Sequence, residues 1–494
     1  MQDHNAKMAS KANPGETLFS RREWLAHWGI SGVGATALLD MLMRDLPAAD
    51  HASPHATEFN PGRFAPRAKR AIHICLIGGM SHVDSFDFKP TLVSHHGKNL
   101  VTTETPDTFN GKIGLLRKPD WAFAPRGQSG LPVSELFPHI ARQADRLTII
   151  RSMVSESANH TPALFFENSG FQFNGFPSLG SWLSYGLGNE SDELPTFVVL
   201  PDHRGGPNGG ASNWSSGFLP AEHQGVSFQS GPEPVRDLYA PNPRGRGADA
   251  DIRRFLDRIQ QKEETTVVPD PILAARLRSY SLAAKMQLSV PEVADISGES
   301  ADVQKLYGLD DDRCSEFGRR CLLARRLAER GVRYIQVYSG GPIAGSPRAS
   351  WDAHENVAEN HSAEAIRIDK PVAALLEDCH RRGLLDDTLI LFTTEFGRTP
   401  FAQSDSDKIG PGRDHNRYGF SVWMAGAGLK PGTSYGATDE IGWKSAENVT
   451  TWHDFHATVL RLFGIDHEQL TYYHNGIRRR LTNVHGTVID KILA

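Results

Sequence analysis

Cysteine is scarce in this chain, with four residues among 494, too few for the disulfide framework of a small secreted domain. An excess of charge of one sign is also missing, because 53 Lys and Arg face 58 Asp and Glu, for a net charge of −5. Without a basic excess, nothing electrostatic predicts a nucleic-acid partner. The hydrophobic fraction of 39% and the charged fraction of 22% exclude wholesale disorder and a multi-span membrane protein.

A long hydrophobic run is absent too. The weakly apolar stretch 28–39 is too short to cross a bilayer of about 30 Å. It follows Arg21-Arg22, and the pattern resembles a twin-arginine export signal; the alternative is a surface amphipathic helix that happens to carry two arginines. We therefore expect residues 1–49 to be read by the twin-arginine export machinery. The protein would be periplasmic or extracellular, with no stable membrane span in the mature chain.

The rest of the chain, residues 50–494, alternates strand patterns with helix patterns. We expect strands at 72–77, 146–153, 196–200, 334–338, 388–394 and 420–425, and helices at 317–330, 371–380 and 454–463. This repetition predicts an α/β domain with a mostly parallel central sheet. In such sheets the ligand site lies at the carboxyl ends of the strands. Two stretches have the composition of insertions, the Gly- and Pro-rich residues 201–234 and the charged region 241–266.

Polar residues follow the first two strands directly. After the first come Gly78-Gly79 and then a polar group that either binds a metal or substrate or caps a turn; its members are Ser81, His82 and Asp84. After the second come Ser155, Ser157, Asn159 and His160. Hydroxyls near a helix N-terminus suit nucleophilic attack on an anionic group, and they suit plain helix capping equally well.

Carboxylate and imidazole side chains recur after the later strands. Asp352 and His354 follow the strand at 334–338, and Glu395 ends the strand at 388–394, with Arg398 and then Asp414-His415 beyond it. A buried Glu395 requires a cation or strong donors, which either a metal ion or Arg398 supplies. Carboxylate with imidazole suits zinc, manganese or iron. The sequence therefore predicts a metal site at this edge of the sheet.

Several long motifs occur together in one order and resemble the DUF1501 family, a family of unknown function. They are the twin-arginine start and residues 78–87, 159–163, 323–333, 351–354, 395–400, 412–415 and 480–486. That family looks like part of the alkaline-phosphatase and sulfatase superfamily, because residues 453–465 and 393–397 are similar to a sulfatase helix and to its strand-ending metal turn. The resemblance implies an alkaline-phosphatase-like three-layer sandwich and hydrolysis by a hydroxyl beside one or two metal ions.

The chain departs from the superfamily pattern at three points. Gly78-Gly79 stand where a metal-binding Asp is usual, and Phe396 replaces the His after the strand-end acid. The sulfatase cysteine signature is absent, which leaves Ser155 or Ser157 as the nucleophile. These differences imply a rearranged site, one metal ion instead of two, or a site without activity.

The leading hypothesis is an exported, metal-dependent hydrolase of a phosphate or sulfate ester, with a small-molecule or glycan substrate. The expected ligands of a zinc, calcium, magnesium or manganese ion are Asp352, His354, Glu395, Asp414 and His415. Ser155 would attack, with Arg398 and His160 steadying the substrate anion; Ser81, His82, Asp84 and Asn159 are further metal or substrate candidates. The alternatives are a non-catalytic glycan- or anion-binding protein on the same fold and an envelope assembly protein.

Overall fold

The computed structural model describes residues 64–494, except residues 105, 110, 230–233, 237, 239–253, 256–257, 260, 262–270 and 344–347. The expected signal segment 1–49 and most of the expected insertion 241–266 lie outside the described residues. Residues 58–494 form one compact unit. Within the part of the chain that the structure describes, no helix has the length and apolarity to cross a membrane.

A nine-stranded sheet forms the centre, in the order β12-β4-β11-β8-β1-β7-β5-β6, with β15 paired to β4. Its strands are β1 (Arg70–Leu76), β4 (Leu147–Val154), β5 (Phe197–Leu200), β6 (Val226–Ser227), β7 (Tyr334–Ser339), β8 (Thr388–Thr394), β11 (Phe420–Ala425), β12 (Thr433–Tyr435) and β15 (Thr450–Thr451). Only β11 among them runs antiparallel to its neighbours, β4 and β8. The mostly parallel sheet is confirmed, and the six expected strands are β1, β4, β5, β7, β8 and β11.

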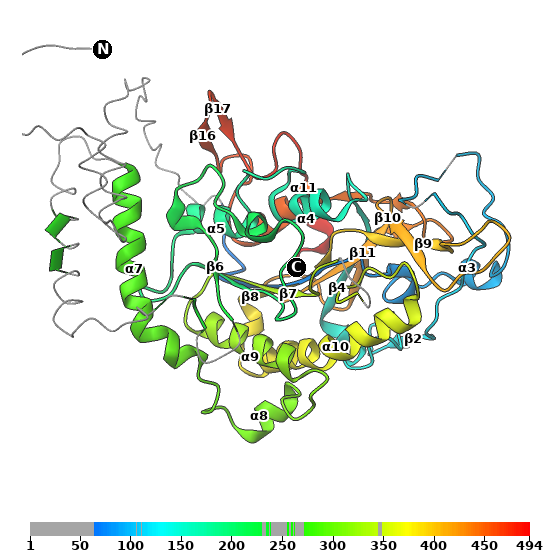
Figure 1. The fold of residues 1–494 in the computed structure, drawn as a ribbon, viewed down its shortest axis with the longest axis horizontal. Helices are drawn as coiled ribbons and strands as arrows, with labels where there is room; N and C mark the ends of the chain where they lie inside the picture. The colour runs from blue at the N-terminus through cyan, green and yellow to red at the C-terminus, as the bar shows by residue number, and fades with distance from the viewer. Residues whose placement is uncertain are drawn as a thin grey trace, which may run out of the picture. The chain divides into compact units, whose positions relative to one another are not determined.

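Helices cover both faces of the sheet (Figure 1). Alternate β1 side chains show why, because Ile72 and Ile74 belong to one hydrophobic core while Ala71 and Cys75 belong to the other. The first core includes α9 (Ser315–Glu329) and α10 (Val357–Arg381). The second includes α4 (His160–Ser169), α5 (Leu179–Leu187) and α11 (Trp452–Leu462). This is the expected three-layer α/β architecture.

One helix differs from its predicted bounds. We expected this helix at 371–380, and proline is common at the first helical position. Instead α10 begins at Val357, and Pro371 lies inside it. The Asn356 side chain accepts a hydrogen bond from the Glu359 amide and so supplies the N-cap. The apolar residues on both sides of Pro371 are buried against α9, and this packing offsets the one backbone hydrogen bond that proline removes.

Smaller elements gather on the margins of the sheet. Near the carboxyl ends of the strands, β9 (Gly397–Ala402) and β10 (Arg413–Asn416) form an antiparallel pair. The expected insertion 201–234 is partly described, and it contributes the edge strand β6. The remaining described α-helices are α3 (Pro90–Ser94), α7 (Pro271–Ala294) and α8 (Ala301–Leu306). Three antiparallel strand pairs are β2–β3 (Phe123–Arg126, Leu131–Ser134), β13–β14 (Ala437–Thr438, Ser445–Glu447) and β16–β17 (Tyr472–His474, Ile477–Arg479). The described 3-10 turns are η1 (His82–Asp84), η2 (Ile140–Arg146), η3 (Gly210–Trp214), η4 (Ala221–His223), η5 (Leu384–Asp386) and η6 (Asp490–Ile492).

Candidate metal centre

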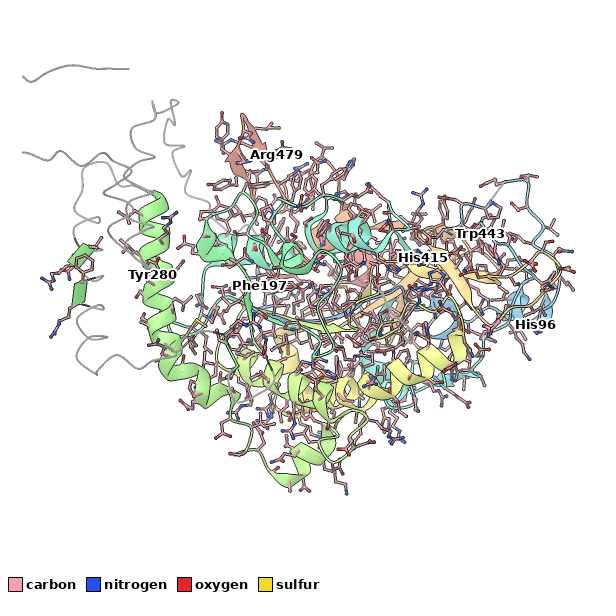
Figure 2. All side chains as sticks on the ribbon, in the orientation of Figure 1. His96, Phe197, Tyr280, His415, Trp443 and Arg479 are labelled. Atoms are coloured by element: carbon pink, nitrogen blue, oxygen red, sulfur yellow. The ribbon has the colours of Figure 1, made fainter. Side chains whose placement is uncertain are left out.

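Loops after the strands bring four side chains to one point at the carboxyl edge of the sheet. Asp352 and His354 lie between β7 and α10, His160 begins α4, and His415 lies on β10. The loop that carries Asp352 lies close against the end of β1, because the Trp351 amide donates to the Ile77 carbonyl at 2.8 Å. Gly78 allows this approach, since a Cβ there would lie 2.4 Å from the Asp352 nitrogen. Figure 2 shows His415 in the region of β9 and β10, with Tyr280 of α7 on the other side of the view.

The four side chains converge through one atom each, and we call them the metal cluster. The Nε2 atoms of His354, His415 and His160 lie 2.9, 3.2 and 3.4 Å from Asp352 Oδ1. The Nε2 atoms of His354 and His415 are 2.9 Å apart. Zinc–nitrogen bonds of about 2.0–2.1 Å place neighbouring ligand atoms roughly 3.3 Å apart in a tetrahedron and about 3 Å apart in an octahedron. The cluster therefore has the spacing of a coordination sphere.

The outer nitrogen of each ring contacts an oxygen. His160 Nδ1 lies 2.7 Å from Glu395 Oε1, and His415 Nδ1 lies 2.6 Å from the Ala158 carbonyl oxygen. His354 Nδ1 lies 2.5 Å from Gln403 Oε1. Carbonyl and carboxylate oxygens only accept hydrogen bonds, so each Nδ1 carries the ring proton when the ring is neutral. All three Nε2 lone pairs then face Asp352 Oδ1 with no proton among them.

The pKa shifts of Asp352 and His415 agree with this reading. Burial alone would raise the pKa of Asp352, but the charge of Arg398 and the contacts with the three rings lower it far below its ordinary range. Burial, together with the charge of Arg398, lowers the pKa of His415 well below its ordinary value and keeps that ring neutral. Burial also lowers the pKa of His160, but its contacts with Asp352 and Glu395 outweigh burial and raise it.

A divalent cation fits this donor set. Three imidazole nitrogens and one carboxylate oxygen are the ligands that zinc and related transition metals prefer, whereas calcium and magnesium prefer oxygen. His160 Nε2 is buried and finds no hydrogen-bond partner among the described residues, and a bound cation would satisfy it. The oxygens behind the rings are the outer partners that orient ligating histidines in metalloproteins.

Glu395, expected as a ligand, has its carboxylate turned to the backbone. Oε1 accepts from the Gly78 amide at 2.9 Å, and Oε2 accepts from the Gly79 amide at 3.1 Å. Glu395 is fully buried, and it also contacts the Nδ1 of His160 and accepts from the Thr394 hydroxyl at 3.3 Å. The two glycine amides and the Phe396 ring, 4.9 Å from the His160 ring, take up the space beside the cluster. The structure thus places Glu395 behind a ligand rather than among the converging atoms.

Asp414 and Arg398 also lie around the cluster and outside the converging set. Asp414 Oδ1 accepts from the His415 amide at 2.7 Å and lies 3.9 Å from His354 Nδ1. Arg398 is fully buried, and it donates to Asp352 Oδ1 at 2.7 Å and to the carbonyls of Gly78 and Gly79. Its guanidinium therefore offsets the charge of Asp352 and ties that loop to the end of β1.

The serine candidates differ in their surroundings. Ser155 is buried, and its Oγ finds no hydrogen-bond partner among the described residues. Ser157 Oγ accepts from the Asn159 amide, and Asn159 caps α4 by accepting from the Thr161 amide. Ser157 and Asn159 thus serve the local turn, whereas the hydroxyl of Ser155 is uncommitted. Ser155 also lies on the segment whose Ala158 carbonyl contacts His415.

Ser81, His82 and Asp84 form a separate buried network. Asp84 Oδ2 accepts from Ser81 Oγ at 2.5 Å and from the Arg413 Nε at 2.8 Å, and both members of the Asp84–Arg413 ion pair are fully buried. His82 Nε2 lies 2.7 Å from the Gly442 carbonyl. The Asp84–Arg413 pair joins β10 to the turn after β1, and the His82 contact joins that turn to the loop between β13 and β14. None of the three side chains is among the converging ligand atoms.

Four groups near the cluster were not predicted from the sequence. Gln403 and the Ala158 carbonyl orient two ligand rings, and Arg348 makes an ion pair with Asp352 Oδ2. Phe109 is 55% exposed, and its ring stacks on His415 with a centroid distance of 4.8 Å. The spacing of residues in the sequence does not predict a contact made by a backbone carbonyl, such as that of Ala158. It also does not predict a contact made by a loop residue from a distant segment, such as Phe109.

A second group of metal-ligand types, His73, Cys75 and Glu167, lies between the central strand β1 and α4 and is buried. Burial, with a smaller contribution from the charge of Glu395, raises the pKa of Glu167 to about 8. Burial lowers the pKa of His73 to about 3. His73 is already hydrogen-bonded at 2.6 Å to both the Tyr334 hydroxyl and Thr393 Oγ1. This group is a neutral hydrogen-bonded network near pH 7.

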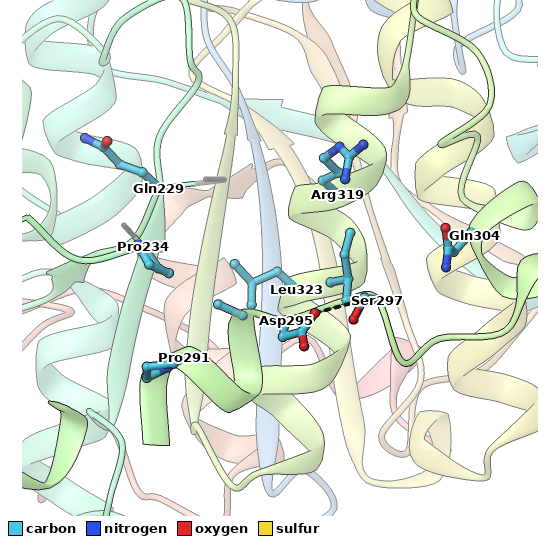
Figure 3. Close-up of a pocket in the computed structure, with 10 residues that line it drawn as sticks. Gln229, Pro234, Pro291, Asp295, Ser297, Gln304, Arg319 and Leu323 are labelled. Carbon is cyan, nitrogen blue, oxygen red and sulfur yellow. Dashed lines mark hydrogen bonds between the residues drawn. The ribbon is translucent and has the colours of Figure 1, made fainter. Parts of the chain in front are cut away.

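A cavity of about 670 Å³ lies elsewhere in the described part of the chain (Figure 3). Pro291 and Asp295, at and just beyond the end of α7, and Arg319 and Leu323 of α9 help to line it. None of the metal-cluster residues lines it.

Comparison with known proteins gives one family match. The family described as "Protein of unknown function (DUF1501)" matches residues 68–493. No curated protein matches the chain. Among solved structures, the chain is similar to the lipoteichoic acid synthase LtaP from Listeria monocytogenes, at 9% identity and a TM-score of 0.35, over 84% of this chain and 75% of that one. It is also similar to the PsFucS1 sulfatase from Pseudoalteromonas sp., at 14% identity and a TM-score of 0.34, over 83% and 73% of the two chains.

Proposed function

We propose that this chain, which belongs to the DUF1501 family, is a metal-dependent hydrolase of a phosphate or sulfate ester. One observation carries the proposal: three imidazole rings direct Nδ1 to an outer oxygen, and their Nε2 atoms converge on Asp352 Oδ1. Four electron-pair donors at one buried point repel one another unless a cation lies between them. His160 thereby joins Asp352, His354 and His415 as a ligand instead of a substrate contact.

Each surrounding group has a role in this proposal. Bound there, the ion would stabilise negative charge on the transferred group and lower the pKa of an attacking hydroxyl. Ser155 supplies the hydroxyl, because its buried Oγ has no competing hydrogen bond among the described residues. Glu395 keeps the proton of His160 on Nδ1, and Arg398 keeps Asp352 ionised. Glu395 and Asp414 are then positioning residues.

We infer a single ion rather than two. The usual acid of a second position is replaced by Gly78-Gly79, whose amides donate to Glu395, and the usual histidine is replaced by Phe396. The donor set favours zinc or manganese over calcium or magnesium. Substrates would be small-molecule or glycan esters.

Metal content tests the proposal. The full chain, purified without chelator or affinity metal, should hold one zinc-class ion, as measured by elemental analysis. Asp352→Asn should lose it, because the amide supplies no charge; Asp405→Asn, an exposed carboxylate paired with Lys408, is the matched control. A metal-loaded wild type would then be screened with aryl phosphates and aryl sulfates. Absence of metal after incubation with zinc, manganese and calcium would refute the proposal.

The second candidate is a non-catalytic glycan- or anion-binding protein. The loss of the second ion position favours it, since hydrolases of this kind commonly use two ions. Anion binding that persists after chelation, without turnover of any ester, would support this candidate and exclude the first.

We also propose export by the twin-arginine route to the periplasm or exterior, from Arg21-Arg22 and the short apolar stretch after them. The double variant Arg21→Lys, Arg22→Lys should accumulate in the cytoplasm. Unchanged fractionation would contradict this assignment.

A further inference from the structure

Arg417 lies where three parts of the proposed site meet. It follows the ligand His415 by two residues, and its carbonyl accepts from the Ser155 amide at 2.9 Å. Its guanidinium donates to the Glu156 carbonyl at 2.8 Å and to Asp107 Oδ2 at 3.1 Å. One cationic side chain is therefore attached both to the segment of the candidate nucleophile and to the strand of a metal ligand.

Asp107 reaches Arg417 from the solvent side. Its carboxylate is 59% exposed and also accepts from the Tyr418 hydroxyl at 3.1 Å. Phe109, two residues further along, stacks on the His415 ring. The Asp107 carboxylate therefore belongs to an exposed segment that packs on a ring of the metal cluster, and it contacts the Arg417 cation.

The other arginines near the cluster are less available. Arg398 and Arg413 are fully buried, and both are occupied by backbone carbonyls and by a buried carboxylate. Arg348 holds Asp352 itself. The side chain of Arg417 is 31% exposed, and its acidic partner is a solvent-exposed residue. Because exposed ion pairs are weak, a competing anion can replace Asp107 at little cost.

We propose that Arg417 is the oxyanion-binding residue of this site, and that the Asp107 carboxylate takes the place of the substrate anion in the unliganded protein. The inference rests on the proposed function and names the group that recognises the ester. The ligand is a tetrahedral oxyanion, as in a phosphate or sulfate ester. Guanidinium groups suit it because they donate two parallel hydrogen bonds to such oxygens.

Titration calorimetry with inorganic phosphate and, separately, inorganic sulfate tests this assignment on the zinc-loaded full chain at fixed ionic strength. Asp107→Asn removes the competing charge and should tighten oxyanion binding about 2- to 5-fold. Glu104→Gln is the matched control, because Glu104 is equally exposed and pairs with Lys444 instead; it should leave the affinity unchanged. Arg417→Gln should weaken binding about 10- to 100-fold, and Arg417→Lys should weaken it less.

The double variant Asp107→Asn, Arg417→Gln isolates the contact. If Asp107 acts through Arg417, Asp107→Asn should have no effect in the Arg417→Gln background. Equal affinities of wild type and Arg417→Gln, or a Glu104→Gln effect as large as that of Asp107→Asn, would overturn the inference. Melting temperature and zinc content are measured for each variant, and the surface change Asp107→Asn decides the outcome if Arg417→Gln fails to fold.

The outcome is separable from the fate of the proposed function. Oxyanion binding that depends on Arg417 in a protein that hydrolyses no ester would keep this inference and favour the anion-binding candidate. Ester hydrolysis with oxyanion affinity independent of Arg417 would keep the hydrolase and reject Arg417. The stronger of the phosphate and sulfate responses identifies the ester class.

Discussion

Replacement of Glu395 by glutamine tests the arrangement of ring protons in the metal cluster. The carboxylate accepts from three N–H groups, those of Gly78, Gly79 and His160. Both of its oxygens are acceptors, so the NH2 group of a glutamine would face an N–H donor in either orientation. At the Oε1 position it would meet His160 Nδ1, and the ring proton would have to move to Nε2, where it blocks the lone pair directed at the metal.

The expected magnitude follows from these contacts. Loss of an outer partner of a ligating histidine typically costs 10- to 100-fold in metal affinity. An unsatisfied buried N–H adds about 1–3 kcal/mol of destabilisation. Glu395→Gln should therefore bind zinc about 10- to 100-fold more weakly and unfold more easily. Competition with a chromophoric chelator measures the affinity, and urea denaturation of the metal-free protein measures the stability.

Glu167→Gln is the matched control, because Glu167 is equally buried and comes from the same helix as His160. Burial raises the pKa of Glu167 to about 8, so its carboxyl is mostly protonated at pH 7 and glutamine resembles it. This variant should keep its zinc affinity. Zinc affinity of Glu395→Gln within about 2-fold of wild type, the resolution of the competition assay, would refute the proposed proton arrangement.

Two further predictions follow. Ser155→Ala should retain the full metal content and lose turnover of any ester that the wild type hydrolyses, measured by elemental analysis and an aryl-ester assay; unchanged turnover would transfer the nucleophile to another group. For Glu167, a pKa raised to about 8 from 4.5 means that the folded chain holds a proton that the unfolded chain releases between those pH values. This contribution to stability is complete below pH 4.5 and declines by up to about 1.4 kcal/mol per pH unit towards pH 8. Urea denaturation of Glu167→Gln across this range should show a shallower decline than wild type, and parallel curves would contradict the assignment.

Much of the fold was predictable because buried parallel strands have a strong apolar signature. The expected strands at 388–394 and 420–425 coincide with β8 and β11. The antiparallel direction of β11 was not predictable, because a strand buried on both faces has the same composition in either direction. The expected start of α10 was also wrong, because the helix begins at the Asn356 cap and continues through Pro371.

The candidate site was predictable as to residue types, but not as to which atoms meet. Sequence spacing placed Asp352, His354 and His415 near one edge of the sheet, and the structure brings them together. Sequence spacing does not distinguish a residue that would bind the metal from one that hydrogen-bonds to a metal-binding residue. Glu395 and Asp414 were therefore expected among the ligands. That distinction depends on which ring nitrogen each residue contacts. Only the three-dimensional packing of the Gly78-Gly79 turn against Glu395 determines it.

The ligands of the metal cluster come from distant parts of the chain, at residues 160, 352, 354 and 415. No short segment can assemble more than two of them, so a partly synthesised or partly folded chain has no competent binding site. Under the proposed function, the cation would bind only after the central sheet has formed. The metals present where the chain completes folding would then be the ones available to the site.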